Sequence, residues 1–440
     1  MTTLLHSARV LTMCEETGEI ENGYVLVDGE KIADVSPQAP DRPLPPADRQ
    51  IDCRGGILLP GFVNLHCHAS MVPFRSMGDD CPDRLRRFLF PLERDAMTRE
   101  LVYLGAKYAI GEMFLSGITT FVDMYYFEDE VAKACEETGM RGYLGETVLS
   151  QVTPSAEHDR EGLRLTREFL SRWHGHPLVH PIVAPHGTTT VSPEALRACH
   201  ELAREYDTLM TIHVSEMDDE MRYFEEMGTT PLGYLDSLSC VDRHLLAAHC
   251  IHLTDGDVKL LAGRGAKVAH CIGSNAKAGK GIAPIRDLRD QGVGFGFGTD
   301  GPSSGNTLSI LDQMRLFAVT QKTKYHDRKL FPAREIVRAA TRGAAECLSP
   351  SPAFGYIAKG ASADLVLIST DSPAMFPAYN PYSALVYAAG TQDVSLVMAG
   401  GKIVVEDHSL TAFSLKDVRA QLQRAMVPFV EAAEKYPDCV

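Results

Sequence analysis

The sequence predicts an α/β fold, a parallel (β/α)8 barrel of the TIM type, and three observations support it. Eight apolar runs alternate with helical patterns over residues 57–350, which is typical of strands joined by helices in a parallel sheet. The number of runs matches that of the closed barrel. Both chain ends are β-rich and bracket this middle region. The alternative is a doubly wound open sheet with more than one domain.

The chain ends show strand and turn patterns. Residues 23–32 form two short strand patterns around an Asp28-Gly29 turn, and a Gly400-Gly401 turn divides a hairpin pattern near the C-terminus. Such dipeptides are typical of hairpin turns. A chain of 440 residues could hold up to three domains of roughly 150 residues, but a barrel of about 250 residues counts as one.

The apolar runs between the ends are short, as strands buried in a parallel sheet are. They lie at residues 57–65, 118–124, 142–148, 178–184, 209–214, 245–249, 266–271 and 293–299. Helical patterns lie between them, for example at 99–115, 128–137, 193–205 and 308–321.

The composition excludes several classes of function. Lys and Arg total 43 and Asp and Glu total 58, so the net charge is −15. This acidity argues against a nucleic-acid polymer as partner, because phosphate binding requires clustered basic residues, and against an anionic membrane surface. The eleven cysteines are odd in number and include no Cys-x-x-Cys. They indicate reduced thiols in a cytoplasmic protein without a signal peptide or a membrane span.

Polar residues close five of the eight runs; four of these runs end in histidine and one in aspartate. A barrel carries its active site at the C-terminal ends of its strands. Residues i and i+2 of a strand share a face, so His66 and His68 can face one ion. Imidazoles with one carboxylate suit Zn²⁺ or another divalent first-row metal. The candidate residues at these strand ends are His66, His68, His213, His249, His270 and Asp300.

A metal held by such a set would leave room for a water molecule, whose pKa it would lower to about 7. Glu216 lies just past His213 and is a candidate for moving protons between that water and a leaving group. A single strand-end histidine is usually only a hydrogen-bonded side chain, with a chance of about one in ten of being a ligand. The set is stronger than its members, because all of them lie at one predicted rim.

Two glycine-rich segments do not predict a nucleotide site. Residues 273–281 resemble a phosphate-binding loop, but five residues rather than four separate the glycines, and Gly281 rather than Ser or Thr follows Lys280. Residues 294–298 alternate Gly and Phe before Asp300 and indicate close packing of the backbone.

Four motifs lie at or next to the predicted strand ends: PGFVNLHCH at 60–68, HVSE at 213–216, AHCIHL at 248–253 and GTDG at 298–301. Together they resemble the amidohydrolase superfamily. Within it, the chain is most similar to the branch of S-adenosylhomocysteine/5′-methylthioadenosine deaminases and triazine hydrolases. The resemblance extends over residues 2–425 and implies a barrel at residues 58–359. It also implies a small β-sandwich domain formed by both chain ends, residues 1–57 and 360–440. Further likeness to this branch lies at residues 121–125 and 274–284.

The resemblance also implies roles for single residues. Glu216 would carry a proton to the ring nitrogen of the substrate, His249 would orient the attacking water, and Asp300 would also accept a proton from that water. Other branches bridge two metals with a carboxylated lysine from the fourth strand, but this sequence has no lysine between Lys133 and Lys259. One divalent ion is therefore expected, Zn²⁺ first, with Fe²⁺ or Mn²⁺ as alternatives. Its implied ligands are His66, His68, His213 and Asp300.

Three positions resemble substrate-facing residues of the branch: Glu93, which would hold ribose hydroxyls, His186, which would contact the nucleoside or the ring, and Ser304. Two positions depart from the branch. The loop after the first strand lacks the tryptophan often found there, because the only tryptophan of the chain is Trp173. Glu146 aligns with an arginine that helps to bind the homocysteine carboxylate, and a carboxylate there would repel such a tail.

Three arginines, Arg84, Arg86 and Arg87, follow the first strand. The favoured interpretation is a solvated helix face. The alternative is that one of them enters the pocket and binds an anionic group.

The sequence thus predicts a metal-dependent hydrolytic deaminase, in which hydroxide attacks the amidine carbon of an amino-substituted heterocycle and ammonia leaves. The ring would belong to an adenosine derivative, another purine, a pterin or a related compound. A triazine chlorohydrolase or aminohydrolase is the alternative, but Glu216 and Asp300 favour a deaminase because expulsion of ammonia requires proton delivery. A non-enzymatic scaffold is disfavoured by the complete ligand set. The expected partner is a small heterocycle, without nucleic acid or membrane, and the resemblance implies a homo-oligomer.

Overall fold

The chain forms two compact units, each assembled from separate stretches of sequence. The structure is a computed structural model that describes residues 1–39, 41, 43–437 and 439. The first unit contains Met1–Asn64, Gly111–Thr120 and Ser309–Ser414. The second contains Leu65–Ile110, Phe121–Leu308 and Leu415–Val440.

Strands from both chain ends form one sheet in the first unit. These strands are β1 (Thr2–Leu11), β2 (Glu19–Asp28), β3 (Lys31–Pro37), β4 (Arg49–Asp52), β5 (Ile57–Pro60), β15 (Leu365–Ile368), β16 (Val394–Ala399), β17 (Lys402–Glu406) and β18 (Ser409–Leu410). Within the described residues the sheet has nine strands in the order β18-β17-β16-β15-β5-β1-β2-β3, with β4 paired to β1. The pairs are antiparallel except for those of β1 with β4 and β5.

The core of this sheet explains its strand pattern. Apolar residues of β1, β2 and β5 form one buried cluster, in which Leu5, Val25 and Leu58 are fully buried. The predicted turns at Gly29 and Gly400-Gly401 join β2 to β3 and β16 to β17, and all three glycines have a positive φ, which glycine adopts at little cost.

A second set of strands is parallel and forms the barrel. These strands are β6 (Phe62–Cys67), β7 (Ile118–Tyr125), β8 (Arg141–Val148), β9 (Val179–Pro181), β10 (Ala184–Pro185), β11 (Met210–Val214), β12 (Leu245–His249), β13 (Lys267–His270) and β14 (Phe295–Phe297). They form the sheets β10-β8-β7-β6, with β9 on β8, and β11-β12-β13-β14. A parallel bridge between Val183 and Met210 joins the two sheets at one edge. At the other, Asp300 N donates to His66 O at 3.0 Å. The barrel is closed, and the predicted fold class is confirmed.

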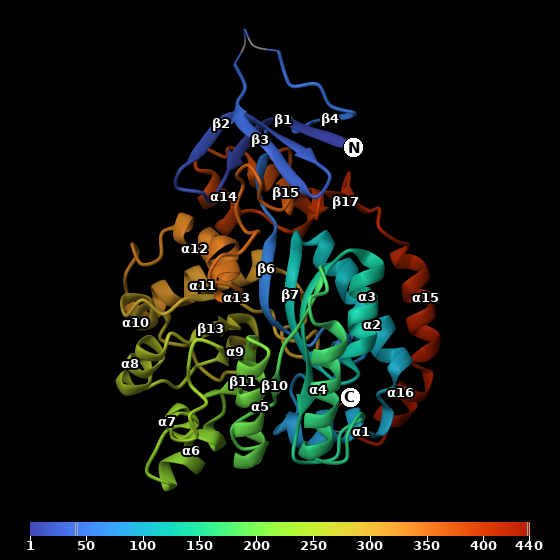
Figure 1. The fold of residues 1–440 in the computed structure, drawn as a ribbon, viewed down its shortest axis with the longest axis vertical. Coiled ribbons are helices and arrows are strands. Elements are labelled where there is room, and N and C mark those ends of the chain that lie inside the picture. Colours follow the sequence, from blue (N-terminus) through green and yellow to red (C-terminus); the bar gives the residue numbers. More distant parts are fainter. Residues whose placement is uncertain (40, 42, 438, 440) are drawn as a thin grey trace. The chain divides into compact units, whose positions relative to one another are not determined.

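Helices connect the parallel strands and lie outside them, as Figure 1 shows for α3, α4 and α5. The C-terminal helix α16 packs against α1, and Figure 1 shows the two side by side. The helices are α1 (Phe90–Ala96), α2 (Arg99–Leu115), α3 (Glu128–Thr138), α4 (Asp159–Trp173), α5 (Pro193–Glu205), α6 (Asp218–Glu226), α7 (Pro231–Ser237), α8 (Asp255–Arg264), α9 (Ile272–Lys277), α10 (Ile285–Asp290), α11 (Ile310–Tyr325), α12 (Ala333–Ala340), α13 (Arg342–Leu348), α14 (Pro381–Tyr387), α15 (Leu415–Ala425) and α16 (Val427–Ala433), with the shorter turns η1 (Ala69–Phe74), η2 (Leu85–Leu89), η3 (Pro373–Met375) and η4 (Thr391–Asp393).

Helix α5 illustrates how local sequence sets the ends of these elements. Ser192 precedes the helix, and its Oγ accepts a hydrogen bond from Ala195 N at 3.3 Å. Pro193 occupies the first helical position. Serine caps helix N-termini with its hydroxyl oxygen, and proline fits the first position because its missing N–H would have no intrahelical partner.

The first apolar run, at residues 57–65, differs from the prediction because it forms two strands. Strand β5 pairs with β1 and β15 in the sheet of the chain ends, whereas β6 belongs to the barrel. Pro60 has no N–H to extend the first ladder. A Cβ at Gly61 would lie 2.2 Å from Thr119 Oγ1, so glycine is required where the chain leaves one sheet for the other.

The prediction that all thiols are reduced is wrong at two positions, because Cys81 and Cys439 form a disulfide. These residues are separated by 358 positions in the sequence, and irregular spacing in sequence carries no information about such a contact. The other nine cysteines are free, and all but Cys14 are buried. Across the described residues, no helix combines the length and the apolar character needed to cross a bilayer.

We predict that Leu58→Ala lowers the free energy of unfolding by about 2–5 kcal/mol, because it leaves a cavity in the core of the chain-end sheet. Urea denaturation followed by circular dichroism measures the change. Val319→Ala is the matched control, since Val319 is 46% exposed in the same unit; we expect its effect to stay within about 0.5 kcal/mol. Equal effects of the two substitutions would contradict the burial of Leu58.

Candidate metal centre and active site

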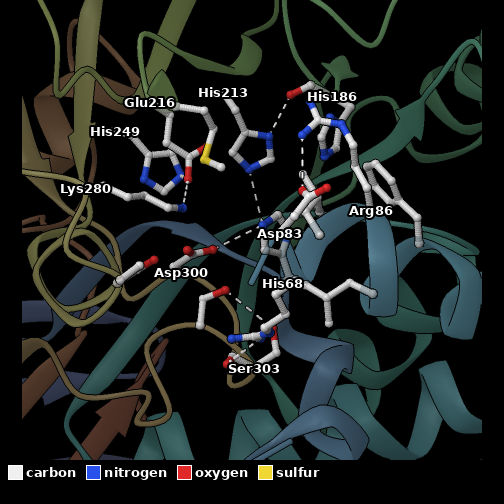
Figure 2. A pocket seen from close by; sticks show the side chains of 18 of the residues that line it. His68, Asp83, Arg86, His186, His213, Glu216, His249, Lys280, Asp300 and Ser303 are labelled. Atoms are coloured by element: carbon white, nitrogen blue, oxygen red, sulfur yellow. Dashed lines mark hydrogen bonds and ion pairs between the residues drawn. The ribbon is translucent and has the colours of Figure 1, made fainter. Parts of the chain in front are cut away.

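A cavity of about 700 Å³ in the second unit collects the predicted site residues (Figure 2). His66 does not line it but is fully buried next to it, with its ring centroid 4.9 Å from those of His68 and His213. The predicted residues that line the cavity are His68, Glu93, His186, His213, Glu216, His249, Asp300 and Ser304.

The four predicted metal ligands lie within a few ångströms of one another. His68 Nε2 is 3.2 Å from Asp300 Oδ1 and 3.3 Å from His213 Nε2, and His66 Nε2 is 3.7 Å from the same aspartate oxygen. Two ligands of one tetrahedral zinc ion, each bound at about 2.0–2.2 Å, have a similar separation. The donor set therefore has the size and chemistry of a divalent metal site.

Backbone carbonyls orient two of these imidazoles. His68 Nδ1 donates to Met124 O at 2.7 Å, and His213 Nδ1 donates to His186 O at 2.6 Å. The proton on Nδ1 leaves Nε2 of each ring as the lone-pair nitrogen that faces the cluster. Metal-binding histidines typically have this arrangement, since the second nitrogen holds the ring in place.

The protonation states also fit a cation. Burial holds the pKa of His66 and His213 well below its usual value, so both rings are neutral, as metal ligands must be. Burial opposes a charge on His68, but Asp300 outweighs it and raises the pKa of His68 to about 9. His68 and Asp300 thus form an ion pair, and a metal ion bound by both would displace the shared proton.

The end of the eighth strand reaches the first strand because Gly298 has no side chain. A Cβ at Gly298 would lie 2.8 Å from His66 Cβ, which agrees with the predicted close packing of residues 294–298. Asp300 and His249 then adopt positive φ angles of 58° and 68°. Such backbone costs of order 1–3 kcal/mol per residue and is common at functional sites. Here the positive φ angles occur at two residues that follow or end a strand and whose side chains line the cavity.

Glu216 and His249 face each other across the cavity, with Glu216 Oε1 3.8 Å from His249 Nε2. His249 Nδ1 donates to Asn275 Oδ1 at 2.9 Å, which holds the ring with Nε2 toward Glu216. Burial opposes ionisation of Glu216, but His249 and Lys280 outweigh it and hold the pKa of Glu216 well below its usual value. Glu216 is therefore a carboxylate that can take up a proton.

Glu93 lies at another wall of the cavity and is almost completely buried. Tyr125 Oη donates to Glu93 Oε1 at 2.8 Å, and Tyr126 Oη donates to Oε2 at 3.5 Å. Burial outweighs these hydrogen bonds and raises the pKa of Glu93 to about 7. The group thus changes charge near neutral pH.

His186 and Ser304 complete the set of predicted substrate-facing residues. The His186 ring lies 4.8 Å from the His213 ring and 5.3 Å from that of Phe90. Burial lowers the pKa of His186 to about 4, so its ring is neutral at pH 7. Ser304 follows Asp300 in a turn closed by its own N–H, which donates to Gly301 O at 2.9 Å.

Residues 57–404 match the model of the amidohydrolase family. The chain belongs to this family. It is 36% identical over 425 residues to 5-methylthioadenosine/S-adenosylhomocysteine deaminase 1 of Syntrophus aciditrophicus, with 96% of each chain covered. It is also 36% identical over 434 residues to the deaminase of the same name from Symbiobacterium thermophilum, with 97% and 99% covered.

Solved amidohydrolase-like structures share the fold over almost the full chain. An adenosine deaminase from Xanthomonas campestris with bound zinc superposes with a TM-score of 0.94, at 29% identity and 98% coverage of both chains. A zinc complex of atrazine chlorohydrolase from Arthrobacter aurescens TC1 superposes with a TM-score of 0.89, at 25% identity, covering 96% of this chain and 100% of that one.

Glu146 does not occupy the position that its alignment in the family suggested. Its carboxylate is buried at the start of α3 and accepts hydrogen bonds from Glu128 N at 2.9 Å and Ser155 Oγ at 2.6 Å. Acidic side chains stabilise a helix N-terminus in this way. The neighbouring strand residue, Thr147, lines the cavity instead, because successive side chains of a strand point to opposite faces. The predicted repulsion of a substrate tail by Glu146 therefore has no structural basis.

The interpretation of the three arginines as a solvated face is wrong for Arg84. Its side chain is 16% exposed, lines the cavity and donates to Ser303 O at 2.7 Å. Arg86 also lines the cavity and pairs with Asp219 at 2.6 Å, whereas Arg87 is exposed. Arg86 and Arg87 belong to the π-helical turn η2 and Arg84 immediately precedes it, and the 3.6-residue periodicity of an α-helix does not apply to such a turn.

Sequence reasoning missed Lys280 and the role of Asn275. Lys280 Nζ contacts Glu216 Oε1 at 2.5 Å, and Asn275 orients His249. Both residues follow the seventh strand, in a segment that resembles the deaminase branch but for which no residue role was predicted. A lysine between Gly279 and Gly281 just past a strand end was the available signal.

A second histidine–aspartate cluster lies outside the cavity, at His200, Asp242 and His244. His244 Nδ1 contacts Asp242 Oδ1 at 3.0 Å, and its Nε2 contacts Asp207 Oδ1 at 3.2 Å. Both nitrogens of His244 therefore already have carboxylate partners, and we interpret this cluster as a hydrogen-bonded network.

We predict that His213→Ala reduces bound metal from about one ion per chain to a small fraction and lowers turnover at least about 1,000-fold, because a ligand is lost. Inductively coupled plasma mass spectrometry of protein purified with zinc measures the metal. His174→Ala, at an exposed histidine of the same unit, should retain both. Full metal content in His213→Ala would exclude this residue as a ligand.

Proposed function

We propose that this protein is a zinc-dependent hydrolytic deaminase that releases ammonia from an amino-substituted aromatic heterocycle, with an adenosine derivative as the first candidate. One observation carries the proposal: Glu216, His249 and Asp300, the residues needed to move protons, line the same cavity as His68 and His213. The names of the deaminases that resemble the chain over nearly its full length support the same reaction.

His66, His68, His213 and Asp300 would hold one divalent ion, most simply Zn²⁺, with Fe²⁺ or Mn²⁺ as alternatives. When bound, such an ion lowers the pKa of a coordinated water to about 7 and so makes a nucleophile available at neutral pH. Zinc is favoured by three imidazoles with one carboxylate and by the zinc in the structurally similar adenosine deaminase.

The side chains of the cavity divide the proton transfers of hydrolysis among them. His249 accepts a hydrogen bond at Nε2 and so orients the attacking water, because Asn275 holds the other nitrogen of the ring. Asp300 and Glu216 start as carboxylates and accept protons from that water. Glu216 then passes its proton to the ring nitrogen next to the amidine carbon, so that the carbon becomes more electrophilic. Asp300 passes its proton to the amino group, which leaves as ammonia when the carbon–nitrogen bond breaks.

A nucleoside fits the remaining walls better than a bare ring does. The Glu93 carboxylate has the acceptor oxygens that two neighbouring ribose hydroxyls require, and Tyr125 and Tyr126 hold it at the cavity wall. His186 is neutral and stands next to His213, where its ring can contact a nucleoside without repelling it. Ser304 contributes a further polar group.

We also propose a cytoplasmic location and a homo-oligomeric state. Nine of the eleven cysteines are free and eight of these are buried, which suits a reducing compartment, whereas the Cys81–Cys439 disulfide is of a kind that is rare there. Cell fractionation tests the location and light scattering of purified protein tests the oligomer; a periplasmic protein or a monomer at micromolar concentration would overturn the respective proposal.

We predict that Glu216→Gln lowers kcat for deamination by about 10²–10⁴-fold, because an amide cannot carry the proton to the ring, while the metal content stays unchanged. An ammonia-release assay over adenosine derivatives, guanine, cytosine, pterins and aminotriazines measures turnover. Glu225→Gln, at an exposed residue of α6, is the control that should retain full activity. Wild-type protein that releases chloride from chlorotriazines, and ammonia from none of these compounds, would instead establish the chlorohydrolase alternative.

We predict that KM for adenosine falls as the pH rises from 6 to 8. With its pKa raised to about 7, Glu93 is largely protonated at the lower pH, and only above pH 7 does the carboxylate accept charge-assisted hydrogen bonds from both hydroxyls. Steady-state kinetics measure this dependence. It should be absent in Glu93→Gln, and absent for adenine, which has no ribose. The same slope with adenine as with adenosine would exclude Glu93 as its source.

A further inference from the structure

Lys280 brings a positive charge to the part of the cavity where the predicted proton carriers lie. Its Nζ is 2.5 Å from Glu216 Oε1, and its side chain is 23% exposed. Figure 2 shows it pointing into the space between the carboxylates of Glu216 and Asp300. Burial lowers the pKa of Lys280, but Glu216 and Asp300 outweigh burial and raise it, so the ammonium stays charged.

The local backbone holds Lys280 in this direction. Gly279 and Gly281 have φ angles of 65° and 117°, which other residues rarely adopt. Lys280 N donates to Asn275 O at 3.0 Å, and the side chain of Asn275 also accepts from His249. Asn275 thus forms hydrogen bonds with both the backbone of Lys280 and the ring of His249. It therefore helps to place both side chains next to Glu216.

The neighbouring Lys277 does not share the contact of Lys280 with Glu216. Lys277 also lines the cavity, but its Nζ contacts Asp79 at 2.6 Å and Asn306 at 2.7 Å. Its charge is thus engaged at a different wall, away from Glu216. The two lysines contact different walls of the cavity because Lys277 is the last residue of α9, whereas Lys280 lies beyond the turn at Gly279.

Lys280 and His249 both lie next to the same oxygen of Glu216. Lys280 Nζ is 2.5 Å and His249 Nε2 is 3.8 Å from Glu216 Oε1. A lysine ammonium has three donors and no acceptor, so Lys280 can bind Glu216 and still face Asp300 without competing for the proton that Glu216 carries.

We propose that Lys280 is a positioning residue for the reaction, holding the Glu216 carboxylate next to His249 at the reacting end of the cavity. The inference rests on the proposed deaminase function. It adds a residue that acts through Glu216 and does not itself bind the substrate ring or the metal.

The test compares Lys280→Met, which keeps the length of the side chain without its charge, with Lys280→Arg, which keeps the charge. We expect Lys280→Met to lower kcat for adenosine about 10–100-fold with KM changed less than about threefold, and Lys280→Arg to recover kcat to within about fivefold of wild type. Metal content should stay unchanged in both. Lys259→Met, at an exposed lysine on α8, is the matched control with full activity.

A crystal structure of zinc-loaded Lys280→Met gives a second measurement that does not depend on turnover. We expect the Glu216 carboxylate to leave its place next to His249. The proposal is overturned if the carboxylate keeps its position in that structure, if Lys280→Met retains wild-type kcat, or if Lys280→Arg is as slow as Lys280→Met. Wild-type protein that releases no ammonia would refute the deaminase function, and the crystal structure would then still decide whether Lys280 positions Glu216.

Discussion

The hydrogen bond from Asp300 N to His66 O closes the barrel, and the active site depends on that closure. It joins the first barrel strand to the end of the last one, so that two predicted metal ligands from opposite ends of the barrel sequence become neighbours. Gly298 makes the approach possible, because any side chain there would collide with His66. The other ligands follow from strand order, since parallel strands deliver their C-terminal residues to one rim.

Closure also concentrates charge where water is scarce. Glu93, Glu216 and Asp300 are at most slightly exposed in one cavity, and isolated carboxylates would be costly there. Their environments differ. Burial raises the pKa of Glu93 to about 7 although two tyrosine hydroxyls donate to it, whereas Asp300 pairs with His68 and Glu216 pairs with Lys280. These differences in environment assign different chemical tasks to three groups that the sequence presents as ordinary acids.

Residues at strand ends were the most predictable part of the site. His66, His68, His213 and Asp300 could be placed together because the period of a strand and the topology of a barrel fix where they lie. Arg84 and Lys280 could not be placed in this way, because each belongs to a loop or an irregular turn whose path depends on contacts distant in sequence. Glu146 shows the converse: an alignment placed it at the substrate, but its side chain points to the opposite face of its strand.

The sequence by itself determined the alternation of strands and helices, the set of candidate metal ligands and the family of the fold. The spacing of apolar residues, the polar residues at strand ends and the short motifs are local properties of the sequence. They can therefore be recognised before the fold is known. Only the tertiary structure decided that run 57–65 divides between two sheets, that Cys81 meets Cys439, and that Lys280 turns toward Glu216. Each of these depends on which distant segments pack together, and that is settled by the free energy of the whole fold.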